Sequence, residues 1–290
     1  MSDAANSLPE RTGRPRAYWS RRKGITPSLT LRQAVDLYVG VLAEFQRRDY
    51  LCEWFGLYCP DDNDVPGRGG RDRDAFVTRR TYRNDLWPIE TRVSSQWDED
   101  AFFTAIEFYY DHVSEGLTGK FHGYSGCGTH WETFNPATAR AEYLAEINSF
   151  LADYGEGYEL LDRGEVVQAG PPGLDTLLAA TPRPVPGRPY EERLAAAVKK
   201  FRSRASSTDD RRDAVRDLAD VLELLRPEVA RVLTKKDDAT IFELANRFGI
   251  RHMDGRQVDD YTKPVWLSWM FYFYLATINA VTHLVERSSD

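Results

Sequence analysis

The chain has 290 residues, a length that suits about two domains. Its formal net charge of −7 argues against a protein that coats nucleic acid by bulk electrostatics, although an RNA enzyme needs only a local basic cleft. Three cysteines in a chain of this length do not indicate a disulfide framework. We therefore expect a cytoplasmic protein with reduced, metal-free thiols.

The first segment, residues 1–28, is polar and rich in arginine, and it lacks the apolar core of a signal peptide. We expect it to be a disordered basic arm.

Residues 29–170 predict a mainly helical N-terminal domain. Helices are expected over 30–46, where Thr30 is a candidate N-cap, over 98–113 and over 139–154. Turn-forming residues indicate a loop over 59–70, and three glycines exclude a helix over 120–136. A small β-hairpin is predicted over 157–170, with Asp162, Arg163 and Gly164 in its turn.

The residue pattern changes after position 170. Residues 171–188 are proline-rich and predict a linker, and residues 189–290 contain only helical patterns. Helices are expected over 190–205, 210–233, 239–249 and 265–285. Their short connections predict a four-helix bundle, so the fold class is mainly α: a helical N-terminal domain with a small hairpin, followed by this bundle.

The segment over 265–285 carries no formal charge and is long enough to span a bilayer. Scattered polar residues and aromatics crowded into its first half favour instead the centre of a bundle or a dimer seam. We expect no membrane association and a homodimer. The side chains expected at the dimer interface are Trp266, Trp269, Met270, Phe273 and Tyr274.

Several strings carry a family resemblance. Near the end of the third bundle helix, ELANRFGIRHMDG (243–255) contains an arginine and a histidine separated by four residues. The remaining strings are LWPI (86–89), AIEFYYDHVS (105–114), HGYSGCGTHWETF (122–134) and GYELLDRGEVV (157–167). On these residues the C-terminal part resembles the HEPN superfamily, and the whole chain resembles the abortive-infection proteins that have an AbiJ-type N-terminal domain.

The resemblance implies a metal-independent endoribonuclease effector of an abortive-infection or toxin-type antiviral defence system. It implies a dimer that acts on RNA without a cofactor and has a possible partner protein or antitoxin. Arg247 and His252 match the family motif as catalytic residues, with Arg251 beside them. We expect Asn246 and Arg256 to bind the RNA.

These residue types suit that chemistry. A histidine that titrates near neutrality can move the proton of the ribose 2′-hydroxyl, and a guanidinium can stabilise the charged phosphorane. The alternative is that Gly249 ends the helix and that Arg247, Arg251 and His252 only cap it. Phe248 follows the motif arginine and keeps open a second function, a non-catalytic module that binds nucleic acid or a partner protein.

A second candidate site consists of His122, Cys127 and His130 in the glycine-rich stretch. Cys127 with either histidine could form a nucleophilic thiolate pair, and with Cys52 and Cys59 it could complete a zinc site. Because neither CxxC nor HExxH spacing is present, a structural loop with a buried thiol is the favoured interpretation.

The loop over 59–70 also has acidic residues near arginines, which predict a solvated loop in preference to a divalent-ion site. These residues are Asp61, Asp62, Asp64, Arg68, Arg71 and Arg73. No P-loop, dinucleotide fingerprint or nucleophile elbow occurs in the sequence, which argues against the commonest NTPases, dehydrogenases and hydrolases.

Overall fold

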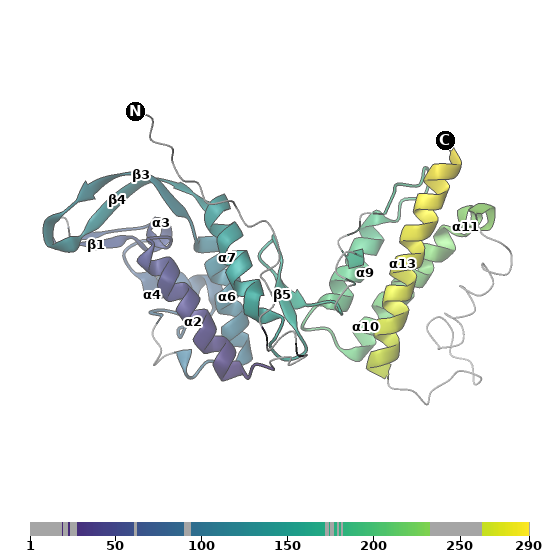
Figure 1. The fold of residues 1–290 in the computed structure, drawn as a ribbon, viewed down its shortest axis with the longest axis horizontal. Coiled ribbons are helices and arrows are strands. Elements are labelled where there is room, and N and C mark those ends of the chain that lie inside the picture. The colour runs from purple at the N-terminus through teal and green to yellow at the C-terminus, as the bar shows by residue number, and fades with distance from the viewer. Residues whose placement is uncertain are drawn as a thin grey trace.

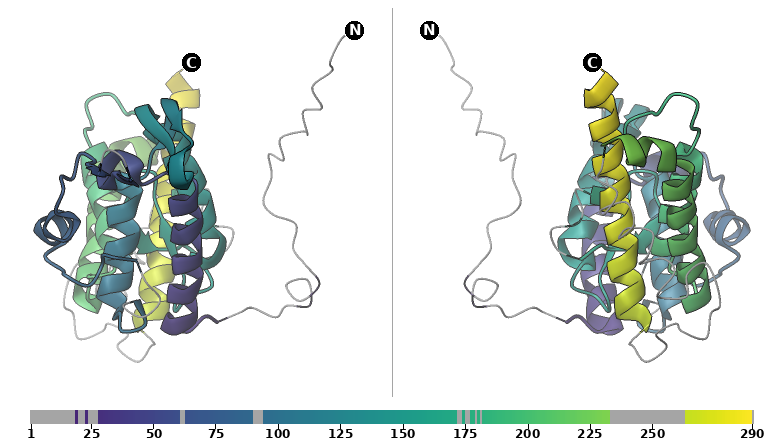
Figure 2. Two further views of the ribbon diagram at one scale, coloured as in Figure 1. Left: turned by 90° about the vertical axis from the view of Figure 1, so that its left-hand side faces the viewer. Right: turned by 90° about the vertical axis from the view of Figure 1, so that its right-hand side faces the viewer.

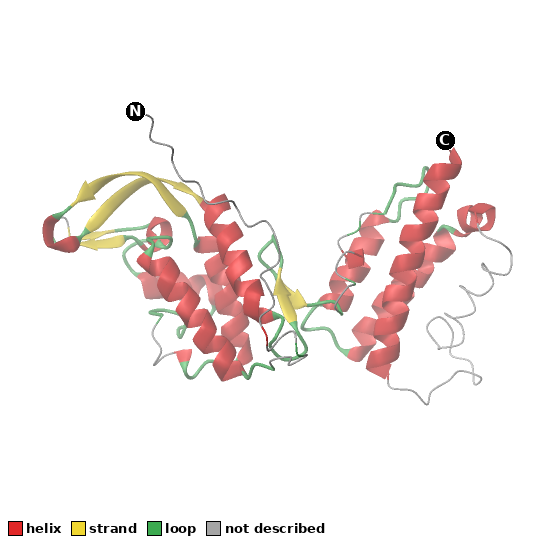
Figure 3. Cartoon of the chain, viewed as in Figure 1, coloured by secondary structure: helices red, strands yellow, loops and turns green. Residues whose placement is uncertain are grey.

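The computed structural model describes residues 28–60, 63–89, 94–171, 174, 177–178, 180, 182–232 and 263–289, together with residues 19 and 23. Within them the chain is mainly helical and has small two-stranded antiparallel sheets, which confirms the predicted fold class in outline (Figures 1 and 3). Two hydrophobic clusters lie one after the other in the sequence. The first spans positions 34–166 and the second spans positions 185–281.

Three long helices organise the first cluster. They are α2 (Leu31–Arg47), α6 (Glu99–His112) and α7 (Pro136–Leu151), and each confirms a helix predicted from the sequence. Thr30 and Gln33 form a capping box at the start of α2, and the carboxylate of Asp98 accepts a hydrogen bond from an amide in the first turn of α6. Two shorter helices, α3 (Cys52–Phe55) and α4 (Arg73–Thr81), complete the helical part.

Helix α6 is the centre of this cluster, because nine of its side chains are buried. Around it, buried tyrosines find hydrogen-bond partners. The hydroxyl groups of Tyr38 and Tyr143 lie 3.0 Å apart, and Tyr143 donates to the carbonyl of Ile106 at 3.0 Å. These two buried hydroxyl groups are thus paired, as a dry interior requires.

The described residues contain three antiparallel two-stranded sheets. The sequence predicted the last, β5 (Tyr158–Leu160) with β6 (Val166–Gln168), and the structure confirms it. The sequence patterns did not predict the other two sheets. One pairs β1 (Leu57–Cys59) with β2 (Asn63–Val65), which lie partly in the expected loop. The other pairs β3 (Glu115–His122) with β4 (Gly128–Asn135). Glycines and exposed faces hide the alternating pattern that identifies a strand.

Strands β3 and β4 form an arm that extends from the helices and arches over α3 towards β1 (Figure 1). No residue of either strand is buried. At the base of the arm the Trp131 ring covers Gly116, where a Cβ atom would meet the ring at 2.2 Å, so only glycine fits this position. The indole of Trp131 also donates to the carboxylate of Asp49 at 3.2 Å.

The second cluster contains α9 (Glu191–Arg202), α10 (Thr208–Leu224), α11 (Arg226–Val232) and α13 (Lys263–Ser289). The prediction of one continuous helix over 210–233 is wrong, because α10 ends at Leu224 and α11 begins at Arg226. Pro227 explains the break, since proline is tolerated in the first turn of a helix but not in its interior. The helix expected over 239–249 lies outside the described residues.

Helix α13, bright yellow in Figure 2, packs against α10 and α11. Two of the five side chains expected at a dimer interface, Met270 and Tyr274, are instead buried within the chain. Trp266 and Trp269 remain 37% and 42% exposed. Among the described residues, no helix combines the length and the apolar character that crossing a membrane requires.

The two clusters meet where β5 and β6 approach the end of α9 (Figure 1). Lys199 pairs with Glu165 at 3.0 Å, Arg202 pairs with Glu159, and Arg204 pairs with Asp100 at 2.8 Å. All the cations come from α9 or the residues just after it, and all the anions come from the N-terminal part of the chain.

Candidate metal centre

Four side chains with metal-binding atoms converge beneath the tip of the β3–β4 arm. They are Cys59, His122, Cys127 and His130, whose Sγ and ring nitrogen atoms all lie within 4.8 Å of one another. Three of them were singled out in the sequence as a second candidate site. The fourth, Cys59, comes from a different hairpin.

Strand pairing explains why the two histidines meet. Lys120 lies opposite His130 and His122 lies opposite Gly128, so the two imidazoles are diagonal neighbours on the same face of the arm. Gly128 has a φ of +95°, a conformation that glycine adopts without strain, and it begins β4 directly after the turn. The pleat therefore points both rings to the face that carries the cysteines.

Each cysteine pairs with one histidine. The Sγ atom of Cys59 lies 3.5 Å from Nδ1 of His122, and the Sγ atom of Cys127 lies 3.1 Å from Nε2 of His130. In a tetrahedral zinc site the edge between a thiolate sulfur and an imidazole nitrogen is about 3.5 Å, given bonds of about 2.3 and 2.0 Å. Both observed pairs are close to this length. The four atoms thus need only a small closing movement to bind one ion.

Burial differs between the two thiols. Cys59 is fully buried at the end of β1, whereas Cys127 is half-buried in the turn that follows the short 3₁₀ helix η1 (Tyr124–Gly126). The two histidines are also half-buried. The site is therefore closed on the side of β1 and reached by solvent from the side of the arm's turn.

Cys52, which the sequence offered as a further zinc ligand, is not among these four residues. Burial raises the pKa of its thiol to about 12, and the nearby carboxylate of Asp49 adds to the increase. Cys52 therefore stays protonated at neutral pH and is a poor ligand. None of the three cysteines is in a disulfide.

The Cys127–His130 contact alone would suit a nucleophilic thiolate with a neighbouring base. The second pair, Cys59 with His122, directly adjoins it and changes that interpretation. Two thiols and two imidazoles form a complete tetrahedral ligand set, whereas a catalytic zinc site keeps one position for water or substrate.

The other candidate site predicted from the sequence is the arginine and histidine motif of the C-terminal part. Asn246, Arg247, Arg251, His252 and Arg256 are all outside the described residues, so their arrangement stays a prediction. In the acidic loop, Asp61 and Asp62 are also outside them. Arg68 forms an ion pair with the buried carboxylate of Glu53 at 2.6 Å.

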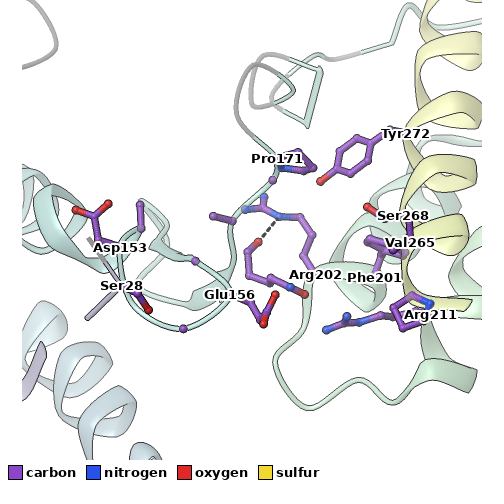
Figure 4. Close-up of a pocket in the computed structure, with 17 residues that line it drawn as sticks. Ser28, Asp153, Glu156, Pro171, Phe201, Arg202, Arg211, Val265, Ser268 and Tyr272 are labelled. Atoms are coloured by element: carbon purple, nitrogen blue, oxygen red, sulfur yellow. Dashed lines mark hydrogen bonds between the residues drawn. The ribbon is translucent and has the colours of Figure 1, made fainter. Parts of the chain in front are cut away.

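A hollow of about 890 Å³ lies between the two parts of the chain (Figure 4). Its lining mixes the carboxylates of Asp153 and Glu156 with the guanidinium groups of Arg202 and Arg211. Arg202 is already engaged, because it donates to the carbonyl of Gln168 at 3.1 Å and pairs with Glu159. The opposed charges favour no one class of ligand, and the cluster of two cysteines and two histidines remains the stronger candidate site.

Comparisons with known proteins do not change this ranking, because no family model, curated protein or solved structure matches the chain. The signal that sequence reasoning lacked was the β3–β4 pairing. Once His122 and His130 are placed on one face of a hairpin, the position of Cys127 in the turn between them indicates that its thiol lies near the two imidazoles.

Proposed function

We propose that Cys59, His122, Cys127 and His130 bind one zinc ion and that the ion is structural, in place of the metal-free loop expected from spacing alone. The observation that carries the proposal is the convergence of four ligand atoms within 4.8 Å from two hairpins that are distant in the sequence. Sulfur and imidazole ligands together suit zinc better than the hard cations magnesium and calcium.

The ion would hold the arm in place, as buried apolar side chains hold the helices elsewhere in the molecule. The arm buries none of its own residues, so little apolar burial holds its tip near β1. Zinc bound to Cys59 on one hairpin and to three residues on the other would join the two hairpins. A structural zinc site contributes its binding free energy directly to folding.

The clamped tip carries exposed aromatic side chains. Tyr58, Phe121 and Tyr124 are 70%, 78% and 63% exposed, and each is within three residues of a proposed ligand. Exposed aromatic groups on a rigid support are typical of recognition surfaces. They support a binding role for the N-terminal part of the chain, with the metal fixing the surface that is presented.

Metal analysis of the purified full chain tests the zinc proposal. We expect about one zinc per chain, and we expect cobalt substitution to give the absorption bands of a tetrahedral site with thiolate ligands. His130→Ala should lose the metal, while Cys52→Ser, the matched control, should keep it. A protein that neither contains nor takes up zinc would remove the proposal.

A second function, carried by the family resemblance, is proposed for the C-terminal helices: a HEPN-like, metal-independent endoribonuclease that acts as a dimer in a defence system. The supporting observation is that α9, α10 and α13 pack around one hydrophobic cluster, with the Arg247 and His252 motif placed between α11 and α13 in the sequence. The short connection between α9 and α10, residues 203–207, is typical of helical bundles.

Cleavage of total RNA by the purified chain tests this second proposal. Activity should not require added divalent ions, should leave a 2′,3′-cyclic phosphate, and should fall about a hundredfold or more in His252→Ala. Arg247→Lys should also be poor, because an ammonium lacks the planar fork of the guanidinium. Zinc content must be measured in every sample, so that loss of the structural ion is not mistaken for metal-dependent chemistry. Unchanged cleavage in Arg247→Ala, Arg251→Ala and His252→Ala would leave the binding-module function.

A further inference from the structure

The two sulfur atoms of the metal centre lie within 4.8 Å of each other but differ in their exposure to solvent. We infer that this pair is an oxidative modification site, at which hydrogen peroxide or a related hydroperoxide converts Cys59 and Cys127 into a disulfide and releases the ion. The inference rests on the proposed zinc site and adds a reaction to it.

The half-buried Cys127 is the sulfur that a peroxide reaches first. Its thiolate attacks one peroxide oxygen, the O–O bond breaks, and Cys127 becomes a sulfenic acid while hydroxide leaves. The thiolate of Cys59 then attacks the Cys127 sulfur and expels a second hydroxide, which forms the S–S bond. Two thiolates are oxidised by two electrons, the peroxide is reduced, and two protons convert the hydroxides to water.

The backbone around Cys127 permits the approach that a disulfide needs. Gly126 and Gly128 flank it with φ of +73° and +95°, and a Cβ atom built on either would meet nothing within 4 Å. Cys59 is held by the β1–β2 pairing with Asn63. The turn of the arm can therefore move towards a fixed partner, which is required because bonded sulfurs are about 2 Å apart.

Oxidation would exchange one kind of link for another. The disulfide still connects β1 to the turn of the arm, but it removes both sulfur ligands from the ion and leaves His122 and His130 alone. Two imidazoles bind zinc far more weakly than the complete set, so the ion dissociates. The arm then keeps one covalent tether and loses the fixed orientation of its exposed aromatic residues.

Cys52 provides an internal contrast. A pKa of about 12 keeps its thiol protonated, and the protonated thiol does not attack peroxide. Peroxide should therefore spare Cys52 at concentrations that oxidise the metal-binding pair.

The experiment treats the zinc-loaded full chain with hydrogen peroxide, follows released zinc with a chromogenic chelator, and maps disulfides by mass spectrometry without reduction. We expect one zinc released per chain, a Cys59–Cys127 linkage, and recovery of zinc binding after dithiothreitol and zinc are added. Cys52→Ser should behave as the unmodified chain does.

The decisive variant is Cys127→His, which replaces one zinc ligand with another and cannot form a disulfide. Zinc bound to this variant, measured before treatment, should be released at least about tenfold more slowly under peroxide, because no exposed thiolate remains. Zinc release from this variant at the unmodified rate would overturn the modification site and leave the zinc site intact. Oxidation of Cys127 to sulfinic acid without a linkage in the unmodified chain would do the same. A chain that binds no zinc before treatment would overturn both.

Discussion

Helix α6 and the β3–β4 arm follow one another in the sequence, and they are stabilised in opposite ways. Nine side chains of α6 are buried, whereas the arm that begins three residues after this helix buries none. The helix is held mainly by its buried apolar side chains. The arm has hydrogen bonds between its strands, one tryptophan at its base, and at its tip three side chains that converge with Cys59 of β1. The difference shows that a protruding element can be positioned by a few specific bonds where burial is not possible.

The largest expected effect lies on the helical side of this comparison. Phe102→Ala removes a fully buried ring from α6 and should lower the free energy of unfolding by about 3–5 kcal/mol. Urea unfolding followed by circular dichroism measures it. The matched control is Phe121→Ala on the arm, where the ring is 78% exposed and the change should be within about 0.5 kcal/mol. Equal losses in the two variants would contradict the contrast.

Removing zinc should affect the arm and spare the helices. At free zinc about a hundred times its Kd, binding stabilises the folded state by about 3 kcal/mol, and this is lost in His130→Ala. Hydrogen exchange should show faster exchange of the β3 and β4 amides in this variant and unchanged exchange in α6. If the arm amides are equally protected with and without the ion, the metal does not hold the arm.

The contact between the two parts of the chain should be intermediate. The Arg202 side chain is only 10% exposed and bonds both Glu159 and the Gln168 carbonyl, so Arg202→Ala should cost about 2 kcal/mol. Arg193→Ala is the control, because the Arg193–Asp220 pair of 2.7 Å has a half-exposed guanidinium and should contribute less than about 1 kcal/mol. Urea midpoints of the two variants give the comparison, and a larger loss in Arg193→Ala would reverse its order.

The smallest expected effect is a pH dependence in the helical core. Burial lowers the pKa of His112 below its ordinary 6.5, with partial opposition from its hydrogen bond to the Phe108 carbonyl. Below pH 6.5 the unfolded chain therefore binds a proton that the folded chain resists, so stability falls as the pH drops through this range. His112→Phe should flatten this dependence in zinc-free protein, where loss of metal at low pH does not contribute. An unchanged slope in the variant would assign the dependence to other groups.

Local signals were enough to predict the long helices of the N-terminal part. Thr30 before α2 and Asp98 before α6 are capping residues that act within one turn, so the sequence contains the whole signal. The β5–β6 hairpin was equally local, with Gly164 in its turn at a φ of +83°. Pro227, by contrast, lies inside the continuous helix predicted over 210–233, although it marks the start of a new one.

The arm and its metal ligands could not be predicted in the same way. No residue in the strands of the arm is buried, and the strands contain glycines, so they lack the alternating apolar pattern. Cys59 reaches the site only because β1 lies beneath the tip of the arm, which is a tertiary relation without a local signal. His122, Cys127 and His130 were recognisable as candidates, but their ligand geometry depends on strand register.

The division of charge between the two parts of the chain has an evolutionary consequence. Lys199, Arg202 and Arg204 supply only cations, and Glu165, Glu159 and Asp100 supply only anions. A charge reversal on one side therefore places like charges together, and a matching reversal on the other side restores their attraction. The C-terminal half could be exchanged for another by recombination, provided that the first helix of the new half carries its cations in the same register as α9. The contact between the two parts thus favours a C-terminal half whose first helix carries cations at these positions.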